Sequence, residues 1–166
     1  MNVERRVVIG VGNEYRSDDG AGLTVAARLR TRVPAGVAVL PCEDEPSRLL
    51  DAFDGAAVAL VVDAVASDAE PGTLHRFDAS LEPVPERVFR SSTHAFGLGE
   101  TIELARALGK LPRCVLVYGI EGADFAAGRG LSPAVEAAVE PTAHAMLEDL
   151  DHLTREEARA RASADR

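Results

Sequence analysis

The sequence contains no tryptophan, and aromatic residues make up only 4% of its 166 residues. The interior must therefore be built from the valine, leucine, isoleucine and alanine that supply most of the 46% hydrophobic content. A core of this composition suits an α/β sandwich, and no internal repeat or linker divides the chain. We expect a single domain over residues 1–153 and a polar tail over 154–166 that is either a helical extension or disordered.

The sequence also has few cysteines, no long apolar segment and fewer basic than acidic residues, and each shortage argues against a class of protein. Cys42 and Cys114 are the only cysteines and lack CxxC spacing, which predicts two buried free thiols and neither a zinc site nor a redox pair. No segment reaches the ~18 consecutive apolar residues of a membrane span, and the N-terminus shows no signal peptide, which predicts a cytoplasmic protein. With 18 basic and 27 acidic residues, the net charge of −9 argues against a nucleic-acid partner and permits metal cations or basic segments.

Strand and helix patterns alternate along the chain. Near-continuous apolar runs predict strands covered on both faces, and a weaker run with alternating polarity predicts an edge strand at 72–77. The continuous runs occupy residues 6–12, 36–42, 56–64 and 113–120. Helical segments are expected at 20–33, 95–108 and from Pro133 to about Leu153, after the capping residue Ser132. These elements predict an α/β three-layer sandwich with a mostly parallel central sheet of about five strands and helices on both faces.

The stretch "GVGNEYRSDDGAG" at 10–22 connects the first strand to the first helix. Its first two glycines resemble the G-x-G-x-x-G turn of dinucleotide-binding proteins, and Glu43 could take the place of the ribose-binding acid. A tyrosine occupies the third glycine position, however, and Asp18 and Asp19 would repel a pyrophosphate at the helix start. We therefore favour a metal site, with Asp18 as the helix cap and Asp19 left as a ligand.

Two further residues are predicted at the same edge of the sheet. Asp63 ends the apolar run of an expected central strand, where a carboxylate either binds a cation or a donor or simply forms a turn. His94 lies at a helix start, where the helix dipole favours the neutral imidazole that a metal ion requires. Asp19, Asp63 and His94 thus predict a catalytic or transiently occupied metal site. His75 and His144 are expected to be structural or solvated, because the edge argument places no acidic cluster beside either of them.

Four motifs together resemble the hydrogenase maturation endopeptidases, which trim the C-terminus of the large subunit of nickel-iron hydrogenases. The motifs are "GVGNEYRSDDGAG", "VVDAV", "STHAFGL" and "GIEGADFAAGRGLSPAVEAAVE", in the family's order and across nearly the whole chain. The resemblance implies an endopeptidase that removes the C-terminal extension of a nickel-loaded precursor. It also implies that Asp19, Asp63 and His94 are both the metal ligands and the catalytic residues, with Asp18 as the helix-capping partner. The precursor then presents the nickel, and other divalent cations can occupy the same ligands.

The mechanism has alternatives at this stage. No GxSxG elbow is present, and Ser91 and Ser92 lie too close to His94 along the chain to indicate a serine triad. The attacking water could be activated by the metal or by a carboxylate. A noncatalytic nickel-sensing or scaffolding module would use the same three ligands. The sequence indicates no oligomeric state and does not identify the precursor.

One segment departs from the family's usual pattern. The stretch "PCEDEPSRLLDAF" at 41–53 replaces the Gly-Thr-rich loop that many members have after the second strand. It is expected to be a loop near the peptide to be cut, with a differently charged entrance that affects the choice of precursor and leaves the metal site untouched. This entrance comprises Cys42, Glu43, Asp44 and Glu45, within an atypical stretch that continues to Leu50.

Overall fold

A five-stranded sheet forms the centre of the computed structural model, which describes residues 4–43, 45–88 and 97–165. Its strands are β1 (Arg5–Gly12), β2 (Val37–Glu43), β3 (Ala56–Val65), β4 (Leu74–Asp78) and β5 (Cys114–Glu121). They lie in the order β2-β1-β3-β5-β4, in which the first four are parallel and β4 pairs antiparallel with β5. The predicted edge strand and the mostly parallel sheet are therefore confirmed.

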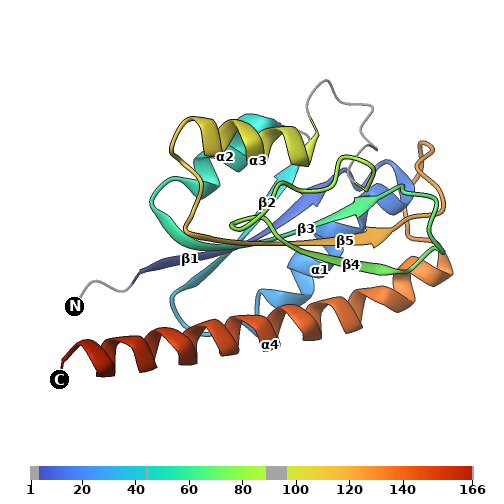
Figure 1. Ribbon diagram of the computed structural model, residues 1–166. Helices are drawn as coiled ribbons and strands as arrows, with labels where there is room; N and C mark the ends of the chain where they lie inside the picture. The colour runs from blue at the N-terminus through green and yellow to red at the C-terminus, as the bar shows by residue number, and fades with distance from the viewer. Residues whose placement is uncertain (1–3, 44, 89–96, 166) are drawn as a thin grey trace.

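Helices cover both faces of this sheet (Figure 1). On one face lie α2 (Pro46–Phe53) and α3 (Leu98–Ala107), and on the other lie α1 (Ala21–Leu29) and α4 (Pro133–Ala164). Successive side chains of a strand point to opposite faces, so the central strands contribute to two separate apolar cores. Apart from the partly buried Val11, the valines and leucines of β1, β3 and β5 are buried because helices cover the sheet on both sides. The predicted three-layer sandwich is confirmed.

The helix α2 lies in the segment 41–53, which the sequence pattern predicts as a loop; that prediction is wrong. Leu49 and Phe53 are one helical turn apart and are only 3% and 1% exposed, because they pack into the core beneath α2 and α3. A helix of eight residues presents little more than one such repeat. Periodicity alone therefore does not separate it from a loop.

The two cysteines are both free thiols. Cys42 on β2 is 4% exposed, so its thiol does not belong to a charged entrance, whereas Glu43 and Glu45 are exposed and Asp44 lies outside the described residues. Cys114 begins β5 and is partly exposed, not buried as predicted; its remaining burial is the main reason that its pKa is raised. The strands β1 and β3 separate the two cysteines.

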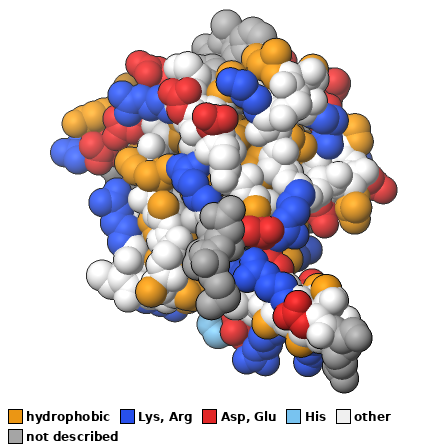
Figure 2. All heavy atoms as spheres, turned by 90° about the vertical axis from the view of Figure 1, so that its left-hand side faces the viewer, with side chains coloured by type: hydrophobic (Ala, Val, Ile, Leu, Met, Phe, Trp, Pro, Cys, Tyr) orange, Lys and Arg blue, Asp and Glu red, His pale blue; other side chains and the backbone are white. Residues whose placement is uncertain are grey.

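The last helix, α4, begins as predicted at Pro133 and includes the stretch 154–164, which forms a helical extension. Arg6 at the start of β1 and Arg113 just before β5 both bind Glu157, which fixes the extension to the amino edge of the sheet. Figure 2 shows this end of the molecule, where basic and acidic side chains interleave. No helix within the described ranges is long and apolar enough to cross a membrane, α4 with its 32 residues included.

The opposite edge of the sheet is where the candidate site lies. The parallel strands β1, β3 and β5 all end there, toward the right of Figure 1. The loops that follow these strands are therefore brought together although they are far apart in sequence.

Candidate active site

The loop after β1 folds back onto the end of that strand. A Cβ at Gly12, whose φ is 148°, would lie 2.0 Å from the backbone oxygen of Asp19, and the N–H of Asn13 donates to the same oxygen at 3.1 Å. The 3-10 helix η1 (Ser17–Gly20) carries Asp19 and packs against β1 and β3. A Cβ at Gly22 would come within 2.3 Å of a backbone oxygen of β1. These glycines permit the close backbone packing that brings Asp19 to the carboxyl edge.

Asp18 is fully buried and does not cap the following helix, so the prediction of a cap is wrong. Its carboxylate accepts hydrogen bonds from the N–H groups of Ala123 (2.8 Å), Asp124 (3.0 Å) and Ser132 (2.7 Å), and from the Ser132 hydroxyl (2.9 Å). Burial alone would raise the pKa of Asp18, but these hydrogen bonds outweigh burial and lower it. The N-cap of α1 is Gly20, and no side chain of the described residues caps that helix or α4. Asp18 instead ties the η1 loop to the loop between β5 and α4.

Asp63 lies within β3, the central strand, two positions before its end. It is partly exposed, and its Oδ1 accepts a hydrogen bond from the N–H of Ala64 at 2.8 Å. A strand position does not support the alternative of a turn-forming aspartate. Because η1 packs against β3, Asp63 and Asp19 lie at the same edge of the sheet. The structure thus places both predicted ligands at the same edge of the sheet, while their role as ligands stays a prediction.

His94, the third predicted ligand, lies outside the described residues, as do Ser91 and Ser92. The helix that follows, α3, begins at Leu98, three residues later than the sequence predicts. Within 4–43, 45–88 and 97–165, no three histidine, cysteine, aspartate or glutamate side chains are arranged to hold a metal ion. Asp19 and Asp63 therefore make up only part of the predicted ligand set, and the position of His94 stays a prediction.

His75 has an acidic partner, Glu121, that its neighbours in the sequence do not indicate. Its Nε2 lies 3.1 Å from Oε2 of Glu121, which is 1% exposed and also accepts hydrogen bonds from the N–H (2.7 Å) and hydroxyl (2.8 Å) of Ser67. Glu121 ends β5 much as Asp63 nearly ends β3. Because Glu121 ends the apolar run "VLVYGIE", its place at the carboxyl edge could have been predicted from the sequence. His144 is exposed on α4, as predicted.

A hollow of about 350 Å³ adjoins η1, α1 and the loop before α4. Its lining comprises Glu14, Ser17, Gly20, Leu23, Thr24, Ala27, Arg129, Gly130 and Leu131. On its rim, the Arg129 guanidinium pairs with Glu14 at 3.0 Å and lies 5.1 Å from the ring centre of Tyr15. The wall beside η1 is therefore polar, with charges that neutralise each other.

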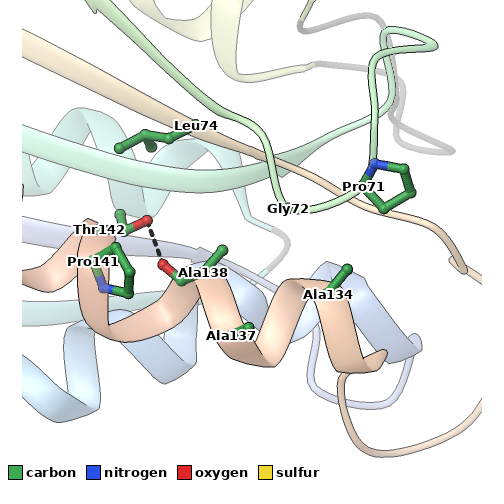
Figure 3. Close-up of a pocket in the computed structure, with 8 residues that line it drawn as sticks. All are labelled: Pro71, Gly72, Leu74, Ala134, Ala137, Ala138, Pro141 and Thr142. Carbon is green, nitrogen blue, oxygen red and sulfur yellow. Dashed lines mark hydrogen bonds between the residues drawn. The ribbon is translucent and has the colours of Figure 1, made fainter.

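A second hollow, of about 260 Å³, lies between the loop before β4, together with the start of that strand, and the first half of α4 (Figure 3). Its lining comprises Pro71, Gly72, Leu74, Ala134, Ala137, Ala138, Pro141 and Thr142. The Thr142 hydroxyl donates to the backbone oxygen of Ala138 at 2.7 Å, as the dashed line shows. None of these lining residues has a titratable side chain, so the groove supplies no acid, base or metal ligand.

Comparison with known proteins places the chain among maturation proteases. Residues 24–149 match the model of the hydrogenase maturation protease family (HycI), a range that includes Asp63 and His94 and begins after Asp19. The Hydrogenase 2 maturation protease of Escherichia coli is 28% identical over 147 residues, which cover 86% of this chain and 88% of the relative. The hydrogenase expression/formation protein HoxM of Azotobacter vinelandii is 30% identical, with 90% of this chain and 74% of HoxM covered. For HupD of Thiocapsa roseopersicina, at 29% identity, this chain spans only 66% of the relative's length.

Solved structures of such proteases share the fold. The hydrogenase maturating endopeptidase HybD of Escherichia coli has a TM-score of 0.77 at 27% identity, over 89% of this chain and 93% of HybD. The nickel-iron hydrogenase maturation protease HycI of Thermococcus kodakarensis has a TM-score of 0.68 at 26% identity, over 89% of this chain and 94% of HycI. These neighbours are hydrogenase maturation endopeptidases, that is, peptide hydrolases. With its family match, its relatives and its fold in agreement, the chain belongs to the hydrogenase maturation protease family.

Proposed function

We propose that this protein is an endopeptidase that removes the C-terminal extension from a nickel-loaded precursor of a nickel-iron hydrogenase large subunit. The observation that supports this most is the convergence of Asp19 and Asp63 on one sheet edge in a chain of the maturation protease family. Ligands of open α/β sheets bind at that edge. Two partly exposed carboxylates there provide the hard oxygen ligands that a divalent cation accepts.

The nickel belongs to the substrate in this proposal. Asp19, Asp63 and His94 bind it from the side that the precursor's cysteines leave open, and this contact places the scissile peptide beside the site. A precursor without nickel has no metal ion that these three residues can bind. Cleavage therefore depends on nickel insertion, and other divalent cations can occupy the same ligands in the isolated protein.

Water, and neither a serine nor a cysteine, is the proposed nucleophile, which makes the enzyme an aspartyl-type endopeptidase. Cys42 is buried, and Cys114 begins β5 and thus lies at the amino edge, away from the site. The water is either polarised by the metal or deprotonated by Asp19 or Asp63. The two free thiols are typical of a reducing compartment, so we place the protein in the cytoplasm.

Incubation with precursor purified with and without nickel tests this function. Mass spectrometry of the large subunit should show loss of the C-terminal extension only for the nickel-loaded form. Asp63→Asn serves as the inactive variant, and His144→Gln, which changes an exposed histidine on α4, serves as a control with native activity. If the nickel-loaded precursor binds but keeps its full mass, the protein is a nickel-sensing or scaffolding module and the proposal is wrong.

A further inference from the structure

A buried carboxylate at the carboxyl edge has no part in the proposed function so far. Glu121 is 1% exposed, and its two oxygens are held by the Ser67 N–H, the Ser67 hydroxyl and Nε2 of His75. Ser67 follows β3, and His75 lies on β4, which pairs with β5. The pair of Glu121 and His75 therefore joins three segments at the edge where Asp63 lies.

The register of the sheet places His75 in one row with Asp63. Gly119 on β5 is opposite Asp63 on β3 and also opposite His75 on β4. Residues paired across neighbouring strands point to the same face, so both side chains lie on the face that α2 and α3 cover. With strands about 4.8 Å apart, the two Cα atoms are separated by roughly 10 Å. Gly119 contributes no side chain between them.

Backbone hydrogen bonds also join the segments that this side-chain pair connects. The N–H of Gly72 donates to the backbone oxygen of Glu121 at 2.7 Å, and the N–H of Glu121 donates to Thr73 at 2.9 Å. The N–H of Gly122 likewise donates to Val65 at 2.9 Å. These backbone bonds already join the loop before β4 to the end of β5. Burial of a carboxylate such as that of Glu121 is unfavourable unless the carboxylate is fully paired.

The hydrogen bond to Glu121 favours one tautomer of the His75 ring. A carboxylate only accepts hydrogen bonds, so Nε2 of His75 carries the hydrogen and donates it. In the neutral ring the lone pair then resides on Nδ1. A carboxylate that orients an imidazole in this way is a common arrangement around reactive histidines. The His75 side chain is 19% exposed, so the ring is not sealed within the core.

We propose that His75 is a further catalytic residue of the cleavage site and that Glu121 is its positioning residue, an inference that rests on the proposed function. In this scheme Nδ1 of His75, in place of Asp19 or Asp63, accepts one proton from the attacking water as the water oxygen bonds to the scissile carbonyl carbon. The same proton passes to the amide nitrogen as the C–N bond breaks, and the second water hydrogen stays with the new carboxyl group. No oxidant or other reactant is needed, and the predicted ligands remain with the substrate's nickel.

Two substitutions test the pair with little change in shape. His75→Gln keeps a side-chain N–H for Glu121 but cannot carry a proton between water and amine. Glu121→Gln presents an amide N–H₂ to His75, so that Nε2 becomes the acceptor and the hydrogen moves to Nδ1. Proton transfer by a positioned side chain contributes about 10²- to 10⁴-fold to the rate, so kcat should fall at least about 100-fold in each variant. KM for the nickel-loaded precursor and the melting temperature should stay near the wild-type values.

The matched control is His144→Gln, which makes the same change at an exposed histidine and should cleave at the wild-type rate. If both variants of the pair keep near-native kcat, His75 has no part in the reaction and the inference is overturned. If both unfold, the pair is structural and the inference is overturned as well. Failure of the wild-type protein to shorten the precursor would instead refute the proposed function, so the two failures are distinguishable.

Discussion

Replacement of Asp18 by asparagine tests whether this buried carboxylate joins the two loops of the candidate site. Its Oδ2 accepts from the N–H groups of Ala123 and Asp124 and from the Ser132 hydroxyl, while its Oδ1 accepts from the Ser132 N–H. Asparagine has one carbonyl oxygen, so its amide N–H₂ must face at least one of these donors. In the best orientation, the carbonyl oxygen of asparagine takes the place of Oδ2 and keeps its hydrogen bonds. The amide N–H₂ then takes the place of Oδ1 and faces the N–H of Ser132, so that two donors meet.

The magnitude follows from that single mismatch. One hydrogen bond to a charged group contributes about 1.5–3 kcal/mol, and a buried donor without an acceptor costs about 1–3 kcal/mol. We expect Asp18→Asn to lower the free energy of unfolding by about 3 kcal/mol in total. For a chain of this size, the melting temperature should fall by roughly 6–12 °C. If Asp18 were the helix cap that the sequence predicts, Asp18→Asn would leave the free energy of unfolding almost unchanged, because asparagine caps a helix about as well.

Thermal denaturation followed by circular dichroism at pH 7 measures this loss. Asp51→Asn, at an exposed aspartate of α2, is the control and should stay within about 0.5 kcal/mol of wild type. The folded-state pKa of Asp18 lies below its ordinary value of 3.8, so the carboxylate's stabilisation is fully present above that value. This stabilisation is lost as the pH falls through the folded-state pKa. The difference in melting temperature between wild type and Asp18→Asn should therefore shrink over the same pH range. Coincident melting of variant and wild type at pH 7 would refute this account of Asp18.

The other predictions concern the ligands, the end of α4 and the packing of α1. Asp19→Asn and Asp63→Asn should abolish nickel-dependent processing, measured by the mass of the precursor; native cleavage by either variant removes that residue from the site. His94→Ala should also stop processing while stability changes by about 0.5 kcal/mol or less, and unfolding would show that the histidine is structural. Burial alone would raise the pKa of Glu157, but the hydrogen bonds from Arg6 and Arg113 outweigh burial, so the pKa is lowered. Glu157→Gln should therefore cost about 1 kcal/mol at pH 7 and increase hydrogen exchange at the end of α4, and its effect should vanish as the pH falls through the folded-state pKa. Gly22→Ala should cost about 3 kcal/mol, because the new Cβ would lie 2.3 Å from a backbone oxygen; unchanged melting would contradict this close packing.

The sequence by itself determined the elements whose signal is local. Strands covered on both faces can carry apolar residues at nearly every position, so the runs at 6–12 and 56–64 identify β1 and β3. Alternating polarity identified β4 as an edge strand. The start of α4 followed from Pro133, because an N–H at the first helical position has no partner within the helix and proline loses nothing by lacking it.

The edge at which Asp19 and Asp63 lie could also be predicted from the sequence, because Asp19 lies in the segment that follows β1 and Asp63 nearly ends β3. Parallel strands end at a common edge, so the positions of the two aspartates along the chain were sufficient to predict that both lie at this edge. The short helix α2 escaped the same kind of reasoning. Its helical state depends on the burial of Leu49 and Phe53 against a sheet assembled from distant segments.

Only the tertiary structure decided the roles of Asp18 and Glu121. The hydrogen-bond partners of Asp18 are 105 to 114 residues away, and those of Glu121 are 46 and 54 residues away. A rule for helix caps considers only neighbours along the chain, so it assigned Asp18 to the helix beside it. Which loops meet depends on the strand order β2-β1-β3-β5-β4, and periodicity within each strand carries no information about that order. A buried carboxylate is stabilised by whichever donors the assembled sheet edge brings to it, and those donors exist as a set only once the chain has folded.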